Sequence, residues 1–96
     1  YGYEHWAEKA IEFYSDKADL VILISSSGKS MNIINAAFKV KEMGMPLVTL
    51  SGFSRDNKLK TIGDINLWVD SSQYNIIETV HQTWILSVID YLIHKA

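Results

Sequence analysis

The sequence predicts an α/β fold in which a parallel sheet is flanked by helices. Three short apolar segments alternate along the chain with segments whose apolar residues recur at helical spacing. The expected order is α-β-α-β-α-β-α, and such alternation implies right-handed crossovers between parallel strands. We therefore expect three layers, with the sheet lying between helices.

The first expected strand, Leu20–Ile24, is an unbroken apolar run. Such a run is typical of an interior strand that is buried on both faces. Two further strands are expected at Pro46–Leu50 and Ile65–Val69. Either the first strand pairs with one of these on each side, or a neighbouring strand that precedes it is missing from this chain.

Helical periodicity and glycine stop signals predict four helical segments, at His5–Ser15, Met31–Met43, Asp56–Ile62 and Asn75–His94. Gly44 and Gly63 stand where the second and third of these are expected to end. The last segment is apolar over most of its girth, so we expect it to be buried on more than one side. In so small a domain this pattern suggests an interface between subunits.

The composition restricts the kind of protein this can be. The 96 residues are 48% hydrophobic and 21% charged, with a net charge of −2. We expect one globular domain over residues 1–96 that does not bind nucleic acid, because a basic surface is absent. The chain has no cysteine, which is compatible with a reducing compartment and a cytoplasmic location. No apolar run approaches the roughly 20 residues of a membrane-spanning helix.

A turn rich in hydroxyl groups, Ser25–Ser30, leads from the first strand into the second helix. Ligands of open parallel sheets bind beyond the carboxyl ends of the strands, and a helix N-terminus offers unpaired amides to an anion. A simple turn and helix cap would need only one serine, whereas four of the six residues here are serines. We therefore expect a phosphate-binding site formed by Ser25, Ser26, Ser27, Gly28 and Ser30.

A nucleotide-binding P-loop is the rival interpretation of this turn, because Gly28-Lys29-Ser30 matches the end of that motif. The first glycine of the motif would have to stand at position 23. Leu23 occupies that position, inside the expected strand, so we do not expect nucleotide hydrolysis.

Glu78 and His81 lie three residues apart and therefore share one face of the last helix. A carboxylate beside an imidazole can transfer protons. Alternatively, Glu78 belongs to a capping box with Asn75, and His81 is a buried structural residue. The residues alone leave both interpretations open. His5 and His94 are expected to be structural or exposed, and no set of metal ligands is evident.

The serine turn, Gly44-Met45-Pro46 and the segment Thr49–Gly52 together resemble the sugar isomerase (SIS) domain. The resemblance is strongest to the phosphoheptose isomerases and spans about Ala18 to Ile93. That family has a turn of the type S-[ST]-S-G-x-S and a Gln-x-x-His pattern on its final helix, where this chain has Glu78-Thr79-Val80-His81.

The resemblance implies a flavodoxin-like or Rossmann-like sheet of five parallel strands in a homodimer or homotetramer. The chain would be the C-terminal portion of such a domain, with the first strands missing. The implied activity is aldose–ketose isomerisation of sedoheptulose 7-phosphate, or a similar sugar phosphate, through an enediol. Glu78 and His81 would be catalytic, and the serine turn would hold the phosphate.

Zinc-binding members of that family carry a further histidine at the position of Leu86, so no cofactor is expected. Two alternatives remain beside the isomerase. One is a non-catalytic regulatory domain that binds sugar phosphates, and the other is a scaffold in which the serine turn is only a helix cap.

Overall fold

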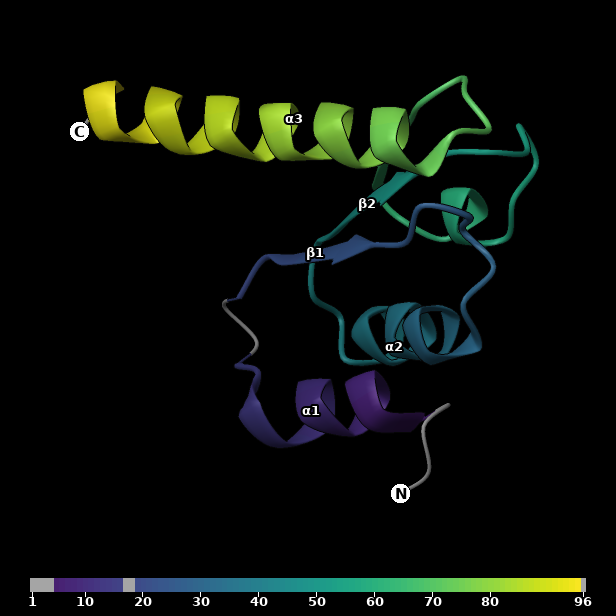
Figure 1. Cartoon of the computed structure of the whole chain (residues 1–96). Coiled ribbons are helices and arrows are strands. Elements are labelled where there is room, and N and C mark those ends of the chain that lie inside the picture. Colours follow the sequence, from purple (N-terminus) through teal and green to yellow (C-terminus); the bar gives the residue numbers. More distant parts are fainter. Residues whose placement is uncertain (1–4, 17–18, 96) are drawn as a thin grey trace.

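The computed structural model describes residues 5–16 and 19–95 (Figure 1). Its elements are α1 (Trp6–Tyr14), β1 (Val21–Ile24), α2 (Met31–Glu42), β2 (Leu47–Ser51), the 3-10 helix η2 (Leu59–Thr61), β3 (Ile65–Trp68) and α3 (Tyr74–Lys95). The predicted order is confirmed, and the ends of the long helices and the strands lie within one residue of those expected. The segment expected to be helical at 56–62 is helical only within η2.

All three described strands are parallel and follow the order β1-β2-β3. Val21 pairs with Leu47, and Val48 pairs with Ile65. β1 is therefore an edge strand that pairs only with β2 among the described strands. The alternative in which the first strand lies between the other two is wrong.

Helices α1 and α2 cover one face of the sheet, and α3 lies over the other (Figure 1). The core fills the space between α1, α2 and the sheet. Its buried residues are Ala7, Val21, Leu23, Ala36, Ala37, Val40, Met45, Leu47 and Leu59. Fully burying one branched side chain of this kind stabilises the fold by about 1.5–3 kcal/mol. This packed face fixes the position from which the serine turn leaves β1.

The opposite face of β1 is not covered in the same way. Val21 and Leu23 are buried toward the core, but Ile22 and Ile24 are 43% and 42% exposed. The prediction that this strand is buried on both faces is wrong for this chain, because α3 packs mainly on β2. A cavity of about 250 Å³ lined only by apolar side chains remains between the sheet and α3.

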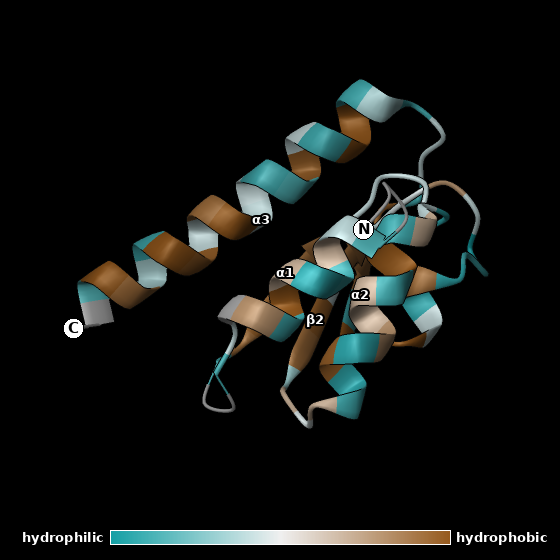
Figure 2. Ribbon diagram, turned by 90° about the horizontal axis from the view of Figure 1, so that it is seen from below, coloured by the Kyte–Doolittle hydropathy of each residue, from teal (hydrophilic) through white to brown (hydrophobic). Residues whose placement is uncertain are grey.

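Helix α3 is the most exposed of the long helices. Of its described side chains, Ile77 and His81 are buried, and most others are exposed. Apolar residues nevertheless continue to the end of the helix, which extends away from the sheet (Figure 2). Within the described residues the helix is therefore buried on one side only, and its expected burial in an interface between subunits stays a prediction. Among the described residues, no helix is long and apolar enough to span a membrane.

Candidate functional site

The serine turn lies where the sequence predicts, between the carboxyl end of β1 and the start of α2. Gly28 adopts a left-handed conformation with φ of +68°. Its amide donates to the carbonyl of Ser25 at 3.0 Å and to the Ser25 hydroxyl at 3.2 Å. The Lys29 amide donates to the Ser27 hydroxyl at 3.2 Å. These two hydroxyls shape the turn as acceptors, and each keeps its own O–H available as a donor.

The N-terminus of α2 follows directly after the serine turn. Ser30 is the N-cap residue, but within the described structure its side chain makes no capping hydrogen bond. The first turn of α2 also contains no acidic residue. The partial positive charge of this helix end and its first amides are therefore not neutralised by a neighbouring side chain of the first turn.

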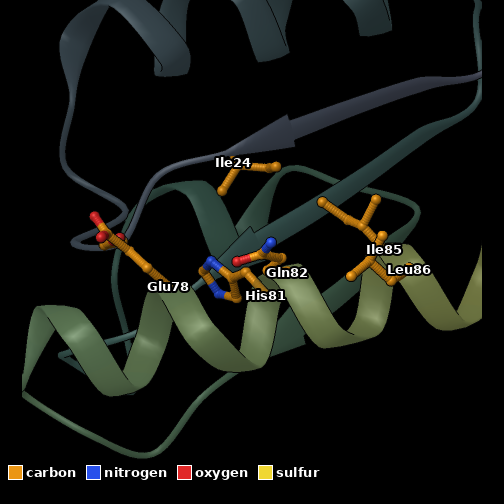
Figure 3. A pocket seen from close by; sticks show the side chains of 7 residues that line it. Ile24, Glu78, His81, Gln82, Ile85 and Leu86 are labelled. Atoms are coloured by element: carbon orange, nitrogen blue, oxygen red, sulfur yellow. The ribbon is translucent and has the colours of Figure 1, made fainter.

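Glu78 projects from the second turn of α3 toward the loop that follows β1 (Figure 3). The helix begins at Tyr74, so Asn75 lies inside it and is not its cap. The first turn is closed instead by the Ile77 amide, which donates to the Gln73 carbonyl at 3.1 Å. The capping-box interpretation of Glu78 is therefore wrong, and its carboxylate is exposed.

His81 is 2% exposed, and its ring is tied to the end of β2. Its Nε2 atom lies 2.9 Å from the carbonyl oxygen of Ser51. Because a carbonyl oxygen only accepts, Nε2 must carry the proton, which leaves Nδ1 as a bare acceptor in the neutral ring. Nδ1 is buried and has no partner within the described part of the chain.

The serine turn and α3 border a common pocket of about 460 Å³. We call it the turn–helix pocket, and its lining residues are Ile24, Ser26, Glu78, His81, Gln82, Ile85 and Leu86. It brings together Ser26, Glu78 and His81, which come from segments some fifty residues apart in the sequence. Ser25, Ser27, Gly28 and Ser30 lie in the adjoining turn but are not among the residues that line it.

Sequence reasoning missed one polar residue of this pocket. Gln82 lies four residues after Glu78, a spacing that places both side chains on the same face of a helix. That spacing could have identified it. The two other histidines are exposed, as expected. His5 pairs with Glu8 at 2.9 Å, and His94 lies 3.4 Å from Asp90.

The residues of this pocket do not form a zinc site by themselves. Nε2 of His81 is occupied by the Ser51 carbonyl, and its Nδ1 atom is buried. Leu86 brings an apolar side chain to the same pocket. Among the described residues, no group of three or more histidine, aspartate or glutamate side chains is placed to hold a metal ion.

The loop beside the serine turn carries charges of both signs. The hydroxyl of Ser54 donates to Asp56 and lowers the pKa of that carboxyl, and its own backbone amide contributes in the same direction. The nearby cations of Lys29 and Lys60 lower this pKa further. Asp56 thus stays ionised and offsets part of the positive charge around the turn.

The open parallel sheet, with a pocket at the carboxyl end of β1, places the chain among α/β proteins, whose ligands generally bind at that end of the sheet. Within that class, the chain is similar to phosphoheptose isomerases. The phosphoheptose isomerases of Aliarcobacter butzleri and Helicobacter pylori strain P12 are each 38% identical to it over 82 residues. That of Glaesserella parasuis is 30% identical over the same length.

The alignments with these relatives cover 84% of this chain and 42% of each relative. The chain thus spans less than half the length of the curated relatives it matches. No family model matches the chain.

Solved structures give the same result for the fold. A phosphoheptose isomerase from Francisella tularensis superimposes with a TM-score of 0.85 at 25% identity, and one from Neisseria gonorrhoeae with 0.87 at 27%. Each alignment covers 94% of this chain, and 48% and 51% of the respective structures. The chain therefore has the SIS fold over about half the length of these enzymes.

Proposed function

We propose that this chain is part of a phosphosugar isomerase that interconverts an aldose and a ketose, with sedoheptulose 7-phosphate or a similar sugar phosphate as substrate. The observation that carries the proposal is the turn–helix pocket, in which Ser26 and Glu78 face the same space. Similarity to proteins named phosphoheptose isomerase supports the choice of substrate.

In this proposal the phosphate binds at the serine turn. The amides at the start of α2 and the hydroxyls of Ser25, Ser26, Ser27 and Ser30 are its donors, and Gly28 allows the close approach of the backbone. Each hydrogen bond to a charged acceptor of this kind stabilises binding by about 1.5–3 kcal/mol. The positive end of α2 adds to this attraction.

Glu78 is the group that carries the proton. Its carboxylate is exposed in the pocket, whereas the ring nitrogens of His81 are either bonded to Ser51 or buried. Glu78 removes the proton from the carbon next to the sugar carbonyl, which gives an enediol after a proton reaches the carbonyl oxygen. Return of a proton to the neighbouring carbon, with loss of one from the other oxygen, completes the isomerisation.

In this proposal His81 positions the part of α3 that carries Glu78. Its hydrogen bond to the Ser51 carbonyl holds the pocket-lining turn of α3 against the end of β2. The Nδ1 atom is buried and unpaired, and an unsatisfied buried polar atom costs about 1–3 kcal/mol. A hydrogen-bond partner from outside the described residues would satisfy it.

We propose further that this chain forms one portion of a larger α/β domain that assembles as a homodimer or homotetramer. The unpaired edge of β1 and the exposed side chains of Ile22 and Ile24 support the first statement. The exposed apolar residues of α3 support the second. A cytoplasmic location and the lack of a cofactor stay predictions.

The test uses the full-length protein and sedoheptulose 7-phosphate in heavy water. We expect an aldose product and deuterium at the carbon that exchanges its proton. Glu78→Gln should lower the rate by about a hundredfold or more, because it removes the proton carrier, and should leave substrate affinity nearly unchanged. Glu42→Gln, an exposed change at the far end of α2, is the matched control. Full activity of Glu78→Gln would refute the role of Glu78.

The alternative function is non-catalytic binding of a sugar phosphate in a regulatory domain. One observation favours it, namely that Leu86 and two isoleucines make much of the turn–helix pocket apolar. The same experiment separates the two functions. A regulatory domain would bind sedoheptulose 7-phosphate but would produce neither aldose nor deuterium incorporation.

A further inference from the structure

Asn57 is a buried polar residue outside the turn–helix pocket. Its side chain belongs to the loop between β2 and η2, and the residue is 3% exposed. Its Nδ2 atom lies 3.1 Å from the Ser51 hydroxyl, 3.1 Å from the Gly52 carbonyl and 3.0 Å from the Ser54 carbonyl. Its Oδ1 atom accepts from the Lys60 amide at 2.9 Å. The whole carboxamide is therefore engaged.

The same carboxamide lies against the serine turn. A Cβ atom on Gly28 would lie 2.0 Å from Oδ1 of Asn57, so the backbone of the turn rests directly on this side chain. The Leu59 amide also donates to the Gly28 carbonyl at 3.1 Å. The loop that Asn57 organises therefore supports the backbone of the serine turn at Gly28.

On its other side, Asn57 reaches the residue that holds His81. The Ser51 hydroxyl is a hydrogen-bond partner of Asn57, and the Ser51 carbonyl is the partner of the His81 ring at 2.9 Å. A continuous line of contacts thus runs from Gly28 through Asn57 and Ser51 to His81. It joins the two segments that border the turn–helix pocket.

We propose that Asn57 is a positioning residue that fixes the spacing between the serine turn and the His81 turn of α3. The inference rests on the proposed function, in which the phosphate binds at one segment and the reacting carbons lie at the other. Only a side chain with both donors and an acceptor fits this place. An aspartate would set a negative charge against three oxygen acceptors and would push the loop away from Ser51.

The chain offers a matched control in Asn66. It is a partly buried asparagine whose carboxamide, like that of Asn57, organises a loop. It does so through Thr49 at 2.6 Å and through the amide and carbonyl of Gly63 at 3.0 and 2.8 Å. Asn66 contacts neither the serine turn nor His81 in any of these bonds. Asn66→Asp therefore reproduces the general cost of a charge in a hydrogen-bonded loop.

The first experiment measures kcat and KM for sedoheptulose 7-phosphate, and the Kd for inorganic phosphate, in the full-length protein. Asn57→Asp should raise KM and the phosphate Kd together by about tenfold, the effect of losing a hydrogen bond to a charged group, and should lower kcat. Asn66→Asp should leave all three within about twofold at a temperature where both variants are folded. Equal effects of the two variants would overturn the inference. If Asn57→Asp does not fold, Asn57→Ser, which keeps one donor, takes its place.

The second experiment tests, without a substrate, whether Asn57 couples the serine turn to His81. In nitrogen-15 spectra, Asn57→Asp should shift the amide signals of the serine turn and the ring signals of His81, whereas Asn66→Asp should shift neither. Shifts confined to residues 52–60 would overturn the proposed coupling. The two proposals can fail separately. If the wild-type protein neither bound nor converted the sugar phosphate, the proposed function would be contradicted. The coupling would still stand if Asn57→Asp shifted the signals of both the serine turn and His81.

Discussion

Gly28 is the residue on which the shape of the serine turn depends most. Its φ of +68° lies in the left-handed region, and a side chain there would meet Asn57. Gly28→Ala should therefore destabilise the fold by about 1–2 kcal/mol from the backbone alone, with a further cost from displacing Asn57. We also expect weaker phosphate binding. Urea unfolding and phosphate titration of the full-length protein measure both effects.

Gly44 provides the control for this prediction. Its φ of +76° carries the same backbone restriction, but a Cβ at this position would meet nothing within 4 Å. Gly44→Ala should thus show the backbone cost without the contact and without a change in phosphate affinity. If the two variants behaved alike, the close contact between Gly28 and Asn57 would have no energetic consequence, which would contradict the prediction.

Individual site residues were predictable where local spacing carries the signal. The serine turn stands after an apolar run, and the spacing of Glu78 and His81 places both on one helix face. Asn57 and Ser51 carry no such signal. An asparagine in a polar loop is typical of an exposed turn, and only the fold brings it beneath Gly28. The accessible state of Glu78 and the buried state of His81 also required the structure.

At the scale of elements, Asp64 joins the end of α2 to the start of two strands. Its carboxylate contacts Lys41 and accepts from the Leu47 amide at 2.8 Å. The Lys41 side chain, and then the Leu47 amide, lower the pKa of Asp64 below its usual value. The ionised form is therefore favoured in the folded state.

This shift predicts a pH dependence of stability. A carboxyl whose pKa is lowered by folding contributes stability above its unfolded pKa, near 3.9, and that contribution is lost as the pH falls through the folded pKa. Asp64→Asn should lower stability at neutral pH and flatten its decline in acid. Urea unfolding between neutral pH and acid measures this. An unchanged acid limb would contradict the prediction.

Lys41→Gln tests the same contact from its other side. It should reduce stability at neutral pH, and the double variant Asp64→Asn, Lys41→Gln should lose less than the sum of the two single variants. Strict additivity would mean that the ion pair contributes nothing to how α2 meets the sheet.

The order and the ends of most helices and strands could be predicted from hydrophobic periodicity, because the spacing of apolar residues shows which face of each segment is buried. The short helix expected at 56–62 did not form as predicted, for a local reason. The Asn57 side chain accepts from the Lys60 amide and donates to carbonyls of the preceding loop. These bonds hold residues 52–57 in a loop, so only Leu59–Thr61 is helical.

At the scale of the whole molecule, two apolar surfaces lack a covering partner among the described residues. One is the α3-facing side of β1, and the other is the C-terminal half of α3, where Leu92 and Ile93 are 56% and 67% exposed. If the α3 surface packs between subunits, the full-length protein should sediment as a dimer or tetramer. Leu92→Asp combined with Ile93→Asp should shift it toward smaller species. A wild-type monomer at micromolar concentration would contradict the proposed assembly.

The sequence predicted the layers of helices and sheet, but it did not predict which segment covers each face of the sheet. An unbroken apolar run such as Leu20–Ile24 indicates that both faces avoid water, yet it cannot say which segment or subunit covers each face. In this chain α2 covers one face, and the other stays largely open. The same limit applies to α3. Apolar residues around most of its circumference indicate contacts on several sides, but they do not identify the segments or subunits that make those contacts.

The roles of the serine turn and Glu78 are tested most directly by a crystal structure of the full-length protein with sedoheptulose 7-phosphate bound. We expect the phosphate at the serine turn, within hydrogen-bond distance of Ser26 and the first amides of α2. We also expect the carbonyl end of the sugar within about 3.5 Å of the Glu78 carboxylate. A phosphate bound away from the serine turn, or a sugar whose reacting carbons lie out of reach of Glu78, would contradict these roles.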